Sequence, residues 1–411
     1  MSLNETVSAE RLHIAFFGKR NAGKSSLVNA VTGQKLAVVS PVKGTTTDPV
    51  KKAMELLPLG PVVIIDTPGC DDEGELGQLR VEKTNEVLNK TDVAVLVYDA
   101  ALGMSAEDEA LLEKLNARKI PVILAANKAD LAECGMQNGR DQGSAAAHTC
   151  APRDAILVSA LTGQGVNELK ERLAELGRSA KAPKYILADL VSPGDTVILV
   201  IPIDESAPKG RLILPQQQTL RELLDLHCVP ICCQVEEIPA VLNNLKKTPR
   251  LVVTDSQAFG KVSSLVPASV PLTSFSILFA RYKGQLATLA AGARALSELK
   301  DGARVLISEG CTHHRQCNDI GTVKIPLWVR GYTRKALEFS FTSGGEFPED
   351  LSGYDLVIHC GGCMLNEAAM QHRIAVAEAA GVPMVNYGVA IAQMHGILTR
   401  SLEPFVRELP D

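Results

Sequence analysis

The chain has 411 residues, a formal net charge of -5 and 46% hydrophobic residues. At about 100–200 residues per domain, this length predicts two to four domains. The nearly balanced charge and the 4% of aromatic residues argue against a nucleic-acid-binding protein, which needs concentrated Lys and Arg or aromatic stacking surfaces. No apolar run approaches the ~18 residues that span a bilayer, and residues 1–11 lack the apolar core of a signal peptide. We therefore expect a cytoplasmic protein whose partners include neither a membrane nor a nucleic acid.

The first 177 residues alternate short apolar runs with helical patterns. Strands of a parallel sheet are predicted at Leu12–Phe17, Pro61–Ile65, Val93–Tyr98, Val122–Ala126 and Ala155–Val158. Helices are predicted at Ser25–Thr32, Glu107–Ala117 and Asn167–Leu176. This alternation predicts an α/β domain with a doubly wound sheet over residues 1–177.

Two smaller α/β units follow a predicted linker at Gly177–Lys184. Strands are predicted at Thr196–Ile203, Ile231–Val235, Leu251–Thr254, Leu272–Ser274, Arg304–Ser308, Leu337–Phe341, Leu356–His359 and Pro383–Asn386. Helices are predicted at Gln218–His227, Ile238–Lys246, Ser256–Val262, Gly284–Leu299 and Glu367–Ala380. We expect a three-domain chain with mainly parallel sheets, divided into residues 1–177, 185–270 and 271–411.

A phosphate-binding loop is predicted at residues 18–25, GKRNAGKS, because they follow a strand and open a helix. Glycines let the backbone wrap the phosphates, and the helix N-terminus adds partial positive charge. We expect Lys24 to reach the β- and γ-phosphates and Ser25 to coordinate Mg²⁺. The nucleotide-binding residues predicted in this segment are Gly18, Asn21, Ala22, Gly23, Lys24, Ser25 and Ser26.

Two further segments are expected to contact the γ-phosphate and Mg²⁺. Asp66 and Gly69 close the second predicted strand, where the carboxylate can hold Mg²⁺ through water and the Gly69 N–H can approach the phosphate. Gly44–Asp48 lies where a first switch segment belongs, and Thr46 is the threonine expected to complete the Mg²⁺ shell. The predicted catalytic residues are Lys24, Thr46, Asp66 and Gly69.

Two short motifs after later strands indicate the base. NKAD at residues 127–130 and SAL at residues 159–161 resemble the guanine-reading motifs of the GTPase family. In that family the carboxylate corresponding to Asp130 accepts from a pair of base donors that adenine lacks, so the resemblance implies GTP. The residues that it places at the base are Asn127, Lys128, Asp130, Ser159 and Ala160.

The sub-type of GTPase is indicated by Asn21 in the phosphate loop and by Gly-Thr-Thr in the switch segment. Both features resemble GTPases of the TrmE–Era group, in which this asparagine helps to hold a K⁺ ion beside the phosphates. Cys70 stands where Ras-like enzymes carry a water-orienting glutamine. The resemblance therefore implies a slow, K⁺-stimulated GTPase.

A cysteine and histidine site is predicted in the last 130 residues. Cys311 and His313 follow one predicted strand, and His359, Cys360 and Cys363 end another. Because strands of one parallel sheet end at the same edge, these loops can converge. Disulfides are not expected in a cytosolic chain, so the open alternatives are a 4Fe–4S cluster on three thiolates, tetrahedral Zn²⁺, or buried thiols. Cys317, six residues after Cys311, is predicted to be a neighbouring structural thiol, with an alternative role as a ligand.

A GTPase domain followed by Cys-x-His and a distant His-Cys-x-x-Cys resembles the HydF family of FeFe-hydrogenase maturation GTPases along the whole chain. The family motif places the cluster thiolates on Cys311, Cys360 and Cys363, with His313 or His359 as a possible fourth ligand. The resemblance implies a scaffold or carrier that receives a 2Fe subcluster precursor made with the radical-SAM maturases HydE and HydG. It also implies delivery to the immature FeFe-hydrogenase and a homodimer formed by the middle domain.

Two other functions remain open from the sequence. The first domain resembles GTPases that act on tRNA or the ribosome, so an RNA-associated GTPase is one alternative. The other is a regulatory GTPase stabilised by zinc. RNA binding and metal content distinguish these from the cluster carrier.

Overall fold

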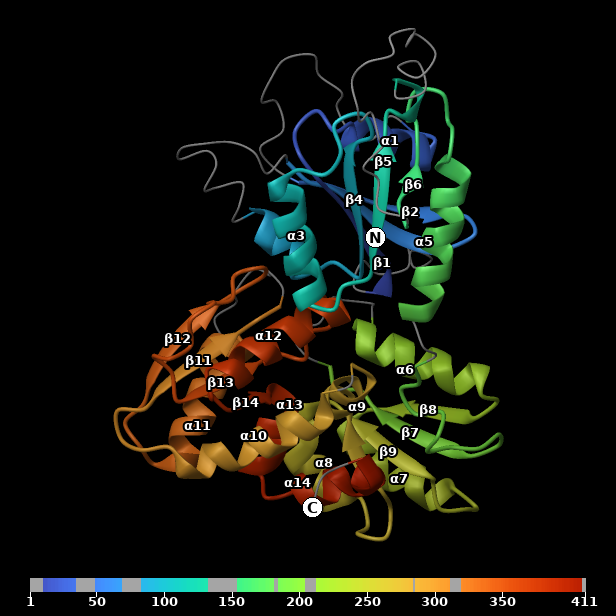
Figure 1. The fold of residues 1–411 in the computed structure, drawn as a ribbon. Helices are drawn as coiled ribbons and strands as arrows, with labels where there is room; N and C mark the ends of the chain where they lie inside the picture. The colour runs from blue at the N-terminus through green and yellow to red at the C-terminus, as the bar shows by residue number, and fades with distance from the viewer. Residues whose placement is uncertain are drawn as a thin grey trace, which may run out of the picture. The chain divides into compact units, whose positions relative to one another are not determined.

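The computed structural model describes residues 10–34, 49–68, 83–131, 154–180, 184–203, 212–283, 285–310 and 319–408. The chain divides into two units, Met1–Ala182 and Pro183–Asp411 (Figure 1). Within the described ranges, no helix is both long enough and apolar enough to cross a bilayer.

The first unit is built on a sheet with the order β2-β3-β1-β4-β5-β6 among the described residues. Its strands are β1 (Leu12–Phe17), β2 (Val50–Leu56), β3 (Gly60–Asp66), β4 (Val93–Asp99), β5 (Val122–Asn127) and β6 (Ile156–Leu157). Neighbouring strands are parallel except β2, which pairs antiparallel with β3. The sequence analysis missed β2 because this edge strand is largely exposed and has no apolar run.

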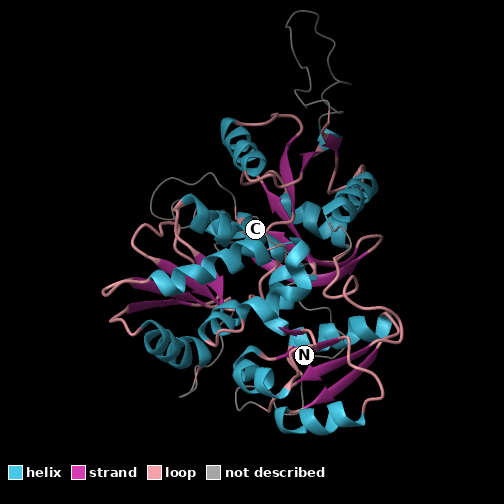
Figure 2. Cartoon of the chain, turned by 90° about the horizontal axis from the view of Figure 1, so that it is seen from below, coloured by secondary structure: helices cyan, strands magenta, loops and turns pink. Residues whose placement is uncertain are grey.

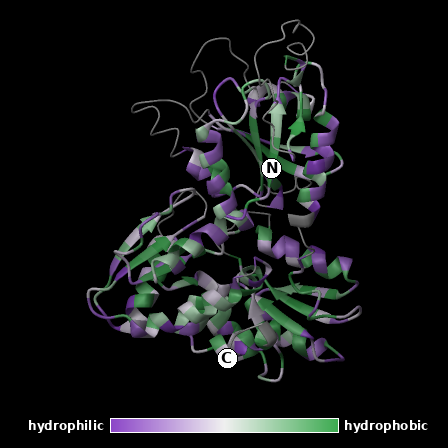
Figure 3. Ribbon diagram, viewed as in Figure 1, coloured by the Kyte–Doolittle hydropathy of each residue, from purple (hydrophilic) through white to green (hydrophobic). Residues whose placement is uncertain are grey.

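Helices cover both faces of this sheet, as a doubly wound fold requires (Figure 2). Two helices, α1 (Lys24–Thr32) and α5 (Val166–Ala180), cover one face. Leu27 of α1 and Leu169 of α5 are buried in the same hydrophobic cluster as Ile14 of β1. On the other face, α3 (Ala106–Ala117) contributes Leu115 to a cluster with Phe17. Figure 3 shows the apolar strands between helices whose outer surfaces are hydrophilic.

Helix α5 continues to Ala180, past the predicted start of the linker at Gly177. A Cβ atom on Gly177 would lie 2.8 Å from Leu12 Cδ2. Glycine therefore allows α5 to approach β1 closely at this point, and it does not end the helix.

The second unit contains two sheets, each with four strands among the described residues and only parallel pairings. The first has the order β10-β9-β7-β8 and the second the order β12-β11-β13-β14. Their strands are β7 (Thr196–Val200), β8 (Val229–Cys233), β9 (Leu251–Thr254), β10 (Leu272–Ser274), β11 (Arg304–Ser308), β12 (Glu338–Thr342), β13 (Leu356–His359) and β14 (Met384–Asn386). The predicted α/β class with mainly parallel sheets is confirmed.

Helices surround both sheets of the second unit (Figure 1). They are α6 (Leu214–Asp225), η2 (Val235–Glu237), α7 (Ile238–Asn244), η3 (Ser256–Ala258), α8 (Phe259–Leu265), α9 (Phe275–Tyr282), α10 (Leu286–Glu298), η4 (Ile320–Lys324), α11 (Ile325–Thr333), α12 (Glu367–Ala379), α13 (Tyr387–Met394), α14 (Leu398–Leu402) and η5 (Glu403–Glu408). The sequence analysis missed α9 and α13, which are buried on most sides and so lack the polar face that makes a helix recognisable.

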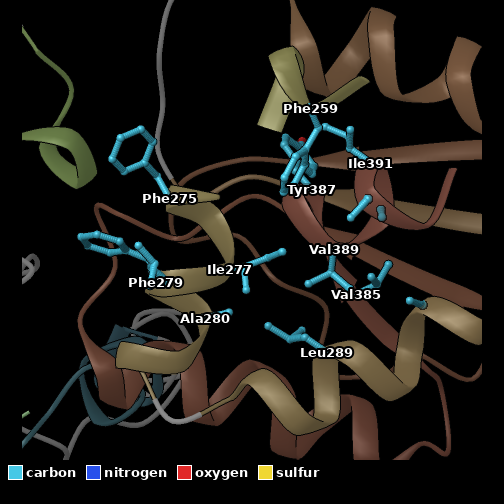
Figure 4. Close-up of a cluster of buried hydrophobic side chains, with 14 of the residues drawn as sticks. Phe259, Phe275, Ile277, Phe279, Ala280, Leu289, Val385, Tyr387, Val389 and Ile391 are labelled. Carbon is cyan, nitrogen blue, oxygen red and sulfur yellow. The ribbon is translucent and has the colours of Figure 1, made fainter. Parts of the chain in front are cut away.

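The two sheets of the second unit share one hydrophobic core. Ile277 of α9, Leu289 of α10 and Val389 of α13 point toward one another in the interior of this unit (Figure 4). The same cluster includes Val253 of β9 and Ile307 of β11. Elements on both sides of the predicted division at residue 270 therefore pack into a single body.

Candidate functional site

The loop between β1 and α1 has the geometry of a phosphate-binding loop. Gly23 is the N-cap of α1 with φ 85°, and Asn21 has φ 63°, a left-handed conformation that asparagine tolerates. The Lys24 ammonium is buried and donates to the carbonyl oxygens of Gly18 (2.8 Å) and Lys19 (2.7 Å). The loop backbone therefore holds this cation at the N-terminus of α1.

Asp66 at the end of β3 lies beside this loop. The Ser25 hydroxyl donates to Asp66 Oδ2 at 2.6 Å, and Asp66 is only 3% exposed. Asp66 Oδ1 has no hydrogen-bond partner among the described residues. Burial raises the pKa of the Asp66 carboxyl, against the lowering effects of Ser25 and Lys24. A buried carboxylate oxygen without a donor, next to a serine hydroxyl, fits the oxygen ligation that Mg²⁺ prefers.

Asn127 at the end of β5 joins the nucleotide motifs to one another. Its Nδ2 donates to the Ala22 carbonyl at 2.9 Å, and its Oδ1 accepts from the Ala160 N–H at 3.1 Å. A Cβ on Gly23 would lie 2.3 Å from Asn127 Nδ2, so this contact requires glycine at position 23. The motifs that the sequence separates by more than a hundred residues therefore meet through one amide side chain.

The other residues predicted to read guanine lie around this amide. Lys128 has φ 62° and its ammonium donates to Asp99 Oδ2 at 2.8 Å. Asp130 is half-buried, and the buried Ser159 hydroxyl accepts from the Thr162 N–H at 3.2 Å. The sequence analysis did not identify Asp99, because a single acidic residue at a strand end carries no motif.

Several predicted residues lie outside the described ranges. They are Thr46, Gly69, Cys311, His313 and Cys317. Their assignments stay predictions. Ser26 is described and lies half-buried on α1.

The second candidate site lies where β11 and β13 end. These strands are parallel neighbours, with Ser308 opposite His359, so the loops that follow leave the same edge of the sheet (Figure 1). The Cys360 sulfur accepts N–H groups from Gly310 (3.1 Å) and Gly362 (3.3 Å). The two loops therefore meet at Cys360, as their predicted place in one parallel sheet requires.

The two described thiols of this site, Cys360 and Cys363, are half-buried. Burial raises the pKa values of Cys360 and Cys363, while the N–H groups on Cys360 and the Lys283 cation near Cys363 act in the opposite direction. The Lys283 ammonium donates to the carbonyl oxygens of Gly362 and Leu365, so it also holds the turn between the cysteines. Within the described part of the chain, no three His, Cys, Asp or Glu side chains form a metal-binding group.

His359 makes two side-chain hydrogen bonds inside the protein. Its Nδ1 lies 2.6 Å from the Cys360 carbonyl oxygen, and its Nε2 lies 2.7 Å from Arg373 Nη1. Burial, and after it the nearby Arg373 charge, lower the pKa of His359 to about 3. The imidazole is therefore neutral. Its predicted role as a metal ligand through Nε2 would require the Arg373 contact to be replaced, while the Nδ1 contact to the Cys360 carbonyl could stay.

Donor chemistry at this edge suits an anionic group held by thiolates. Backbone N–H groups on a sulfur favour the thiolate over the thiol. Metal binding requires deprotonated cysteine, and the two N–H groups on the Cys360 sulfur oppose the effect of burial, which favours the thiol. By contrast, the adjacent cysteines of β8 lie apart from this edge: Cys232 is exposed and Cys233 is buried.

Three family models match this chain. Residues 13–128 match a model described as 50S ribosome-binding GTPase. Residues 186–284 match the Hydrogen maturase F dimerization domain, and residues 287–404 match the Hydrogen maturase F tetramerization domain. The last match includes Cys360 and Cys363.

Curated relatives resemble the first part of the chain. The tRNA modification GTPase MnmE of Prochlorococcus marinus is 32% identical over 183 residues, which are 44% of this chain and 38% of that protein. The enzyme of the same name from Heliobacterium modesticaldum is 36% identical over 160 residues, which are 39% of this chain and 33% of that protein. The chain thus spans little more than a third of the length of these relatives.

Solved structures with similarity include an Era variant from Aquifex aeolicus bound to GDP.AlF4-. That match covers 56% of this chain and 97% of that chain, with 21% identity and a TM-score of 0.33. The G domain of the T. maritima FeoB iron transporter covers 41% of this chain and 99% of that chain, with 26% identity and a TM-score of 0.28.

Proposed function

The chain belongs to the Hydrogen maturase F family, and from that premise we propose that it is a GTP-hydrolysing maturation factor for FeFe-hydrogenase. It binds a 4Fe–4S cluster and assembles or delivers the 2Fe subcluster precursor. The observation that carries this proposal is the meeting of the β11 and β13 loops at the Cys360 sulfur, in a chain that also has a nucleotide site.

In the first unit, the described residues support binding of GTP with Mg²⁺. Lys24 faces the loop that would surround the phosphates, Asp66 and Ser25 offer oxygen ligands, and Asn127 holds the base-reading loop against the phosphate loop. Thr46 and Gly69 complete the predicted catalytic set, and Asn21 is the predicted K⁺ ligand. Turnover is slow and stimulated by K⁺; equal rates in K⁺ and Na⁺ would contradict this part of the proposal.

In the second unit, Cys360 and Cys363, together with Cys311, hold the cluster, and His313 or His359 is the possible fourth ligand. Three thiolates leave one iron available to a further ligand, which is the chemistry that a carrier of a metal precursor needs. Gly310 and Gly362 donate to sulfur, and Lys283 holds the turn between the two cysteines.

The partners proposed are the immature FeFe-hydrogenase, the radical-SAM maturases HydE and HydG, and further copies of this chain in the cytoplasm. Self-association is supported by the matched dimerization and tetramerization models. β8 is the edge strand of the first sheet in the second unit, where it could pair with a second copy. The functional segments stay those of the sequence analysis: residues 1–177, 185–270 and 271–411.

The first experiment measures iron and acid-labile sulfide in full-length protein reconstituted without oxygen, with the EPR spectrum after reduction. We expect about four irons per chain, lost in Cys311→Ala, Cys360→Ala and Cys363→Ala. Cys233→Ala removes a buried thiol from the same unit and is expected to keep the iron. Zinc in place of iron, or iron that is indifferent to Cys360→Ala, would overturn the cluster assignment.

An RNA-associated GTPase is the second candidate, because the curated relatives are tRNA modification GTPases. A filter-binding measurement with tRNA tests it. Saturable binding that depends on the nucleotide, in protein that holds no iron, would favour this function over the cluster carrier.

A further inference from the structure

Arg373 joins three strand ends at the edge of the sheet that carries the cysteines. From α12, its Nη1 donates to Ser308 Oγ (3.2 Å) at the end of β11 and to His359 Nε2 (2.7 Å) at the end of β13. Its Nη2 donates to the Gly344 carbonyl (2.6 Å), just after β12. The guanidinium also lies 5.0 Å from the centre of the Phe347 ring. A single side chain therefore holds the loops that follow three adjacent strands.

The contacts of His359 show where the charge of this pair resides. A carbonyl oxygen only accepts, so the short contact to the Cys360 carbonyl places the proton on His359 Nδ1. Nε2 then has a lone pair, which accepts from Arg373. The imidazole is neutral, and the positive charge remains on the guanidinium.

That charge is buried without an acidic partner among the described residues. Arg373 is 3% exposed, and its described hydrogen-bond acceptors are a hydroxyl, an imidazole and a carbonyl. Burial lowers the pKa of Arg373 to about 10, while the Cys360 thiolate acts in the opposite direction. An arginine stays charged at neutral pH even so. Burying such a charge with only neutral hydrogen-bond partners is unfavourable, so the folded protein gains stability when an anion lies nearby.

We propose that Arg373 is a positioning residue of the cluster site, which holds the loops of β11 and β13 through neutral His359 and offsets the negative charge of the thiolate-bound cluster. The inference rests on the proposed cluster, which would place additional negative charge at Cys360 and Cys363. A cluster held by three thiolates is an anion, and accepting an electron makes it more negative. A fixed cation close by therefore favours the reduced state and retention of the iron. His359 serves as the hydrogen-bond acceptor that connects Arg373 to the Cys360 backbone.

The test is an EPR-monitored redox titration of the reconstituted full-length protein, with the rate of iron loss to a chelator as a second readout. Arg373→Gln is expected to bind the cluster but to lower the reduced-to-oxidised ratio at fixed potential at least tenfold, which is about 59 mV for one electron. Arg330→Gln is the matched control, because Arg330 is exposed and also lies over a phenylalanine ring, that of Phe339. It should leave the potential and the iron unchanged.

Arg373→Lys separates charge from hydrogen bonding. Lysine keeps the positive charge but cannot make the several hydrogen bonds of the guanidinium. We therefore expect a reduced-to-oxidised ratio within threefold of wild type at the same potential, and faster loss of iron to the chelator. If Arg373→Lys lowered the ratio as much as Arg373→Gln, or if Arg373→Gln matched wild type in both readouts, the proposal would be overturned. Wild-type protein that held no iron would instead overturn the proposed function itself.

The role of His359 is tested by His359→Gln, whose amide oxygen can still accept from Arg373. Pulsed EPR of the reduced cluster detects a directly bound imidazole as a strong coupling to nitrogen. We expect the wild-type and His359→Gln spectra to show the same couplings. A strong coupling present in wild type and lost in His359→Gln would make His359 a ligand and would overturn its place in this network.

Discussion

The nucleotide site and the cysteine site lie in the same kind of place, the carboxyl edge of a parallel sheet, but they hold their charges differently. In the first, Lys24 and Asp66 belong to the motifs themselves and lie on either side of Ser25. In the second, Lys283 and Arg373 come from α9 and α12, outside the Cys-x-x-Cys segment. A site for a soluble nucleotide is formed by loop backbone and local charges, whereas the cysteine site has buried cations supplied by the surrounding helices.

This difference has a physical reason. A nucleotide binds and dissociates, so the charged groups of its site are held in place by the loop's own backbone, as the Gly18 and Lys19 carbonyls hold Lys24. A thiolate-bound group is enclosed by protein, and an enclosed anion needs cations that are enclosed with it. Variants at the two sites should therefore differ in kind: nucleotide-site variants change binding and rate, and cysteine-site variants change stability and metal properties.

The largest effect is expected for Asp66→Asn. It keeps the size of the side chain but removes the charge that would hold Mg²⁺, which is worth several kcal/mol and so at least about 10²-fold in the rate of GTP hydrolysis. Phosphate release in saturating GTP and Mg²⁺ measures it. Asp154→Asn, at an exposed site in the same unit, should keep the wild-type rate. A rate within threefold of wild type for Asp66→Asn would remove Asp66 from the metal site.

The next effect is on the stability of the second unit. Lys283→Met removes the donor to the Gly362 and Leu365 carbonyls, so we expect the free energy of unfolding of iron-free protein to fall by about 1–3 kcal/mol. Denaturant titration followed by circular dichroism measures it. Lys261→Met changes an exposed lysine of the same unit and should have no effect beyond error. Equal stability of the two variants would show that Lys283 does not hold the cysteine turn.

A matched pair of glycines isolates the contact that joins the nucleotide motifs. Gly23 and Gly33 both have positive φ, 85° and 66°, so Ala at either position should cost about 1–2 kcal/mol of stability. Only at Gly23 would the added Cβ meet Asn127 Nδ2. Gly23→Ala should therefore also weaken binding of a fluorescent GTP analogue about tenfold, which corresponds to the loss of about one hydrogen bond. Similar affinities in the two variants would contradict the bridging role of Asn127.

The smallest effect concerns the surface ion pair between Lys19 and Glu107, 2.7 Å apart. Hydrogen bonds, the largest from Lys19 and others from the Glu107 N–H and from Ser105, lower the pKa of Glu107 from 4.5 to about 2. A depressed carboxyl pKa stabilises the folded state above pH 4.5, and this stabilisation is lost as the pH falls toward 2. The difference in melting temperature between wild type and Glu107→Gln should therefore be small at pH 7 and should narrow below pH 4.5.

Because both side chains are solvent-accessible, salt should also reduce this difference. Glu109→Gln, which changes an exposed glutamate in the same turn of α3, provides the comparison for the loss of one surface carboxylate. If the difference in melting temperature between wild type and Glu107→Gln stayed constant down to pH 3, the ion pair would not form in solution.

Sequence alone was sufficient for the buried strands and for the position of the nucleotide motifs at strand ends. The runs at Leu12–Phe17 and Val93–Tyr98 are apolar throughout because parallel strands are buried on both faces, and such runs stand out from their polar flanks. Asp66 and Asn127 could be assigned because each stands at the end of such a run in a short, spaced motif. The meeting of the loops after β11 and β13 was also predictable, because parallel strands of one sheet end at the same edge.

Tertiary structure alone decided what lies behind those motifs. β2 has no apolar run, and α9 and α13 have no polar face, so no sequence pattern indicates these elements. Gly177 resembles a helix-ending glycine in the sequence, but in the structure it allows α5 to pack closely against Leu12. The roles of Arg373 and Lys283 could not be predicted from the sequence, because nothing in the sequence around them distinguishes a buried arginine or lysine from an exposed one. Their roles depend on which side chains the packing of α9 and α12 brings within hydrogen-bond distance of the cysteine loops, and that distance is set by contacts between residues far apart in the chain.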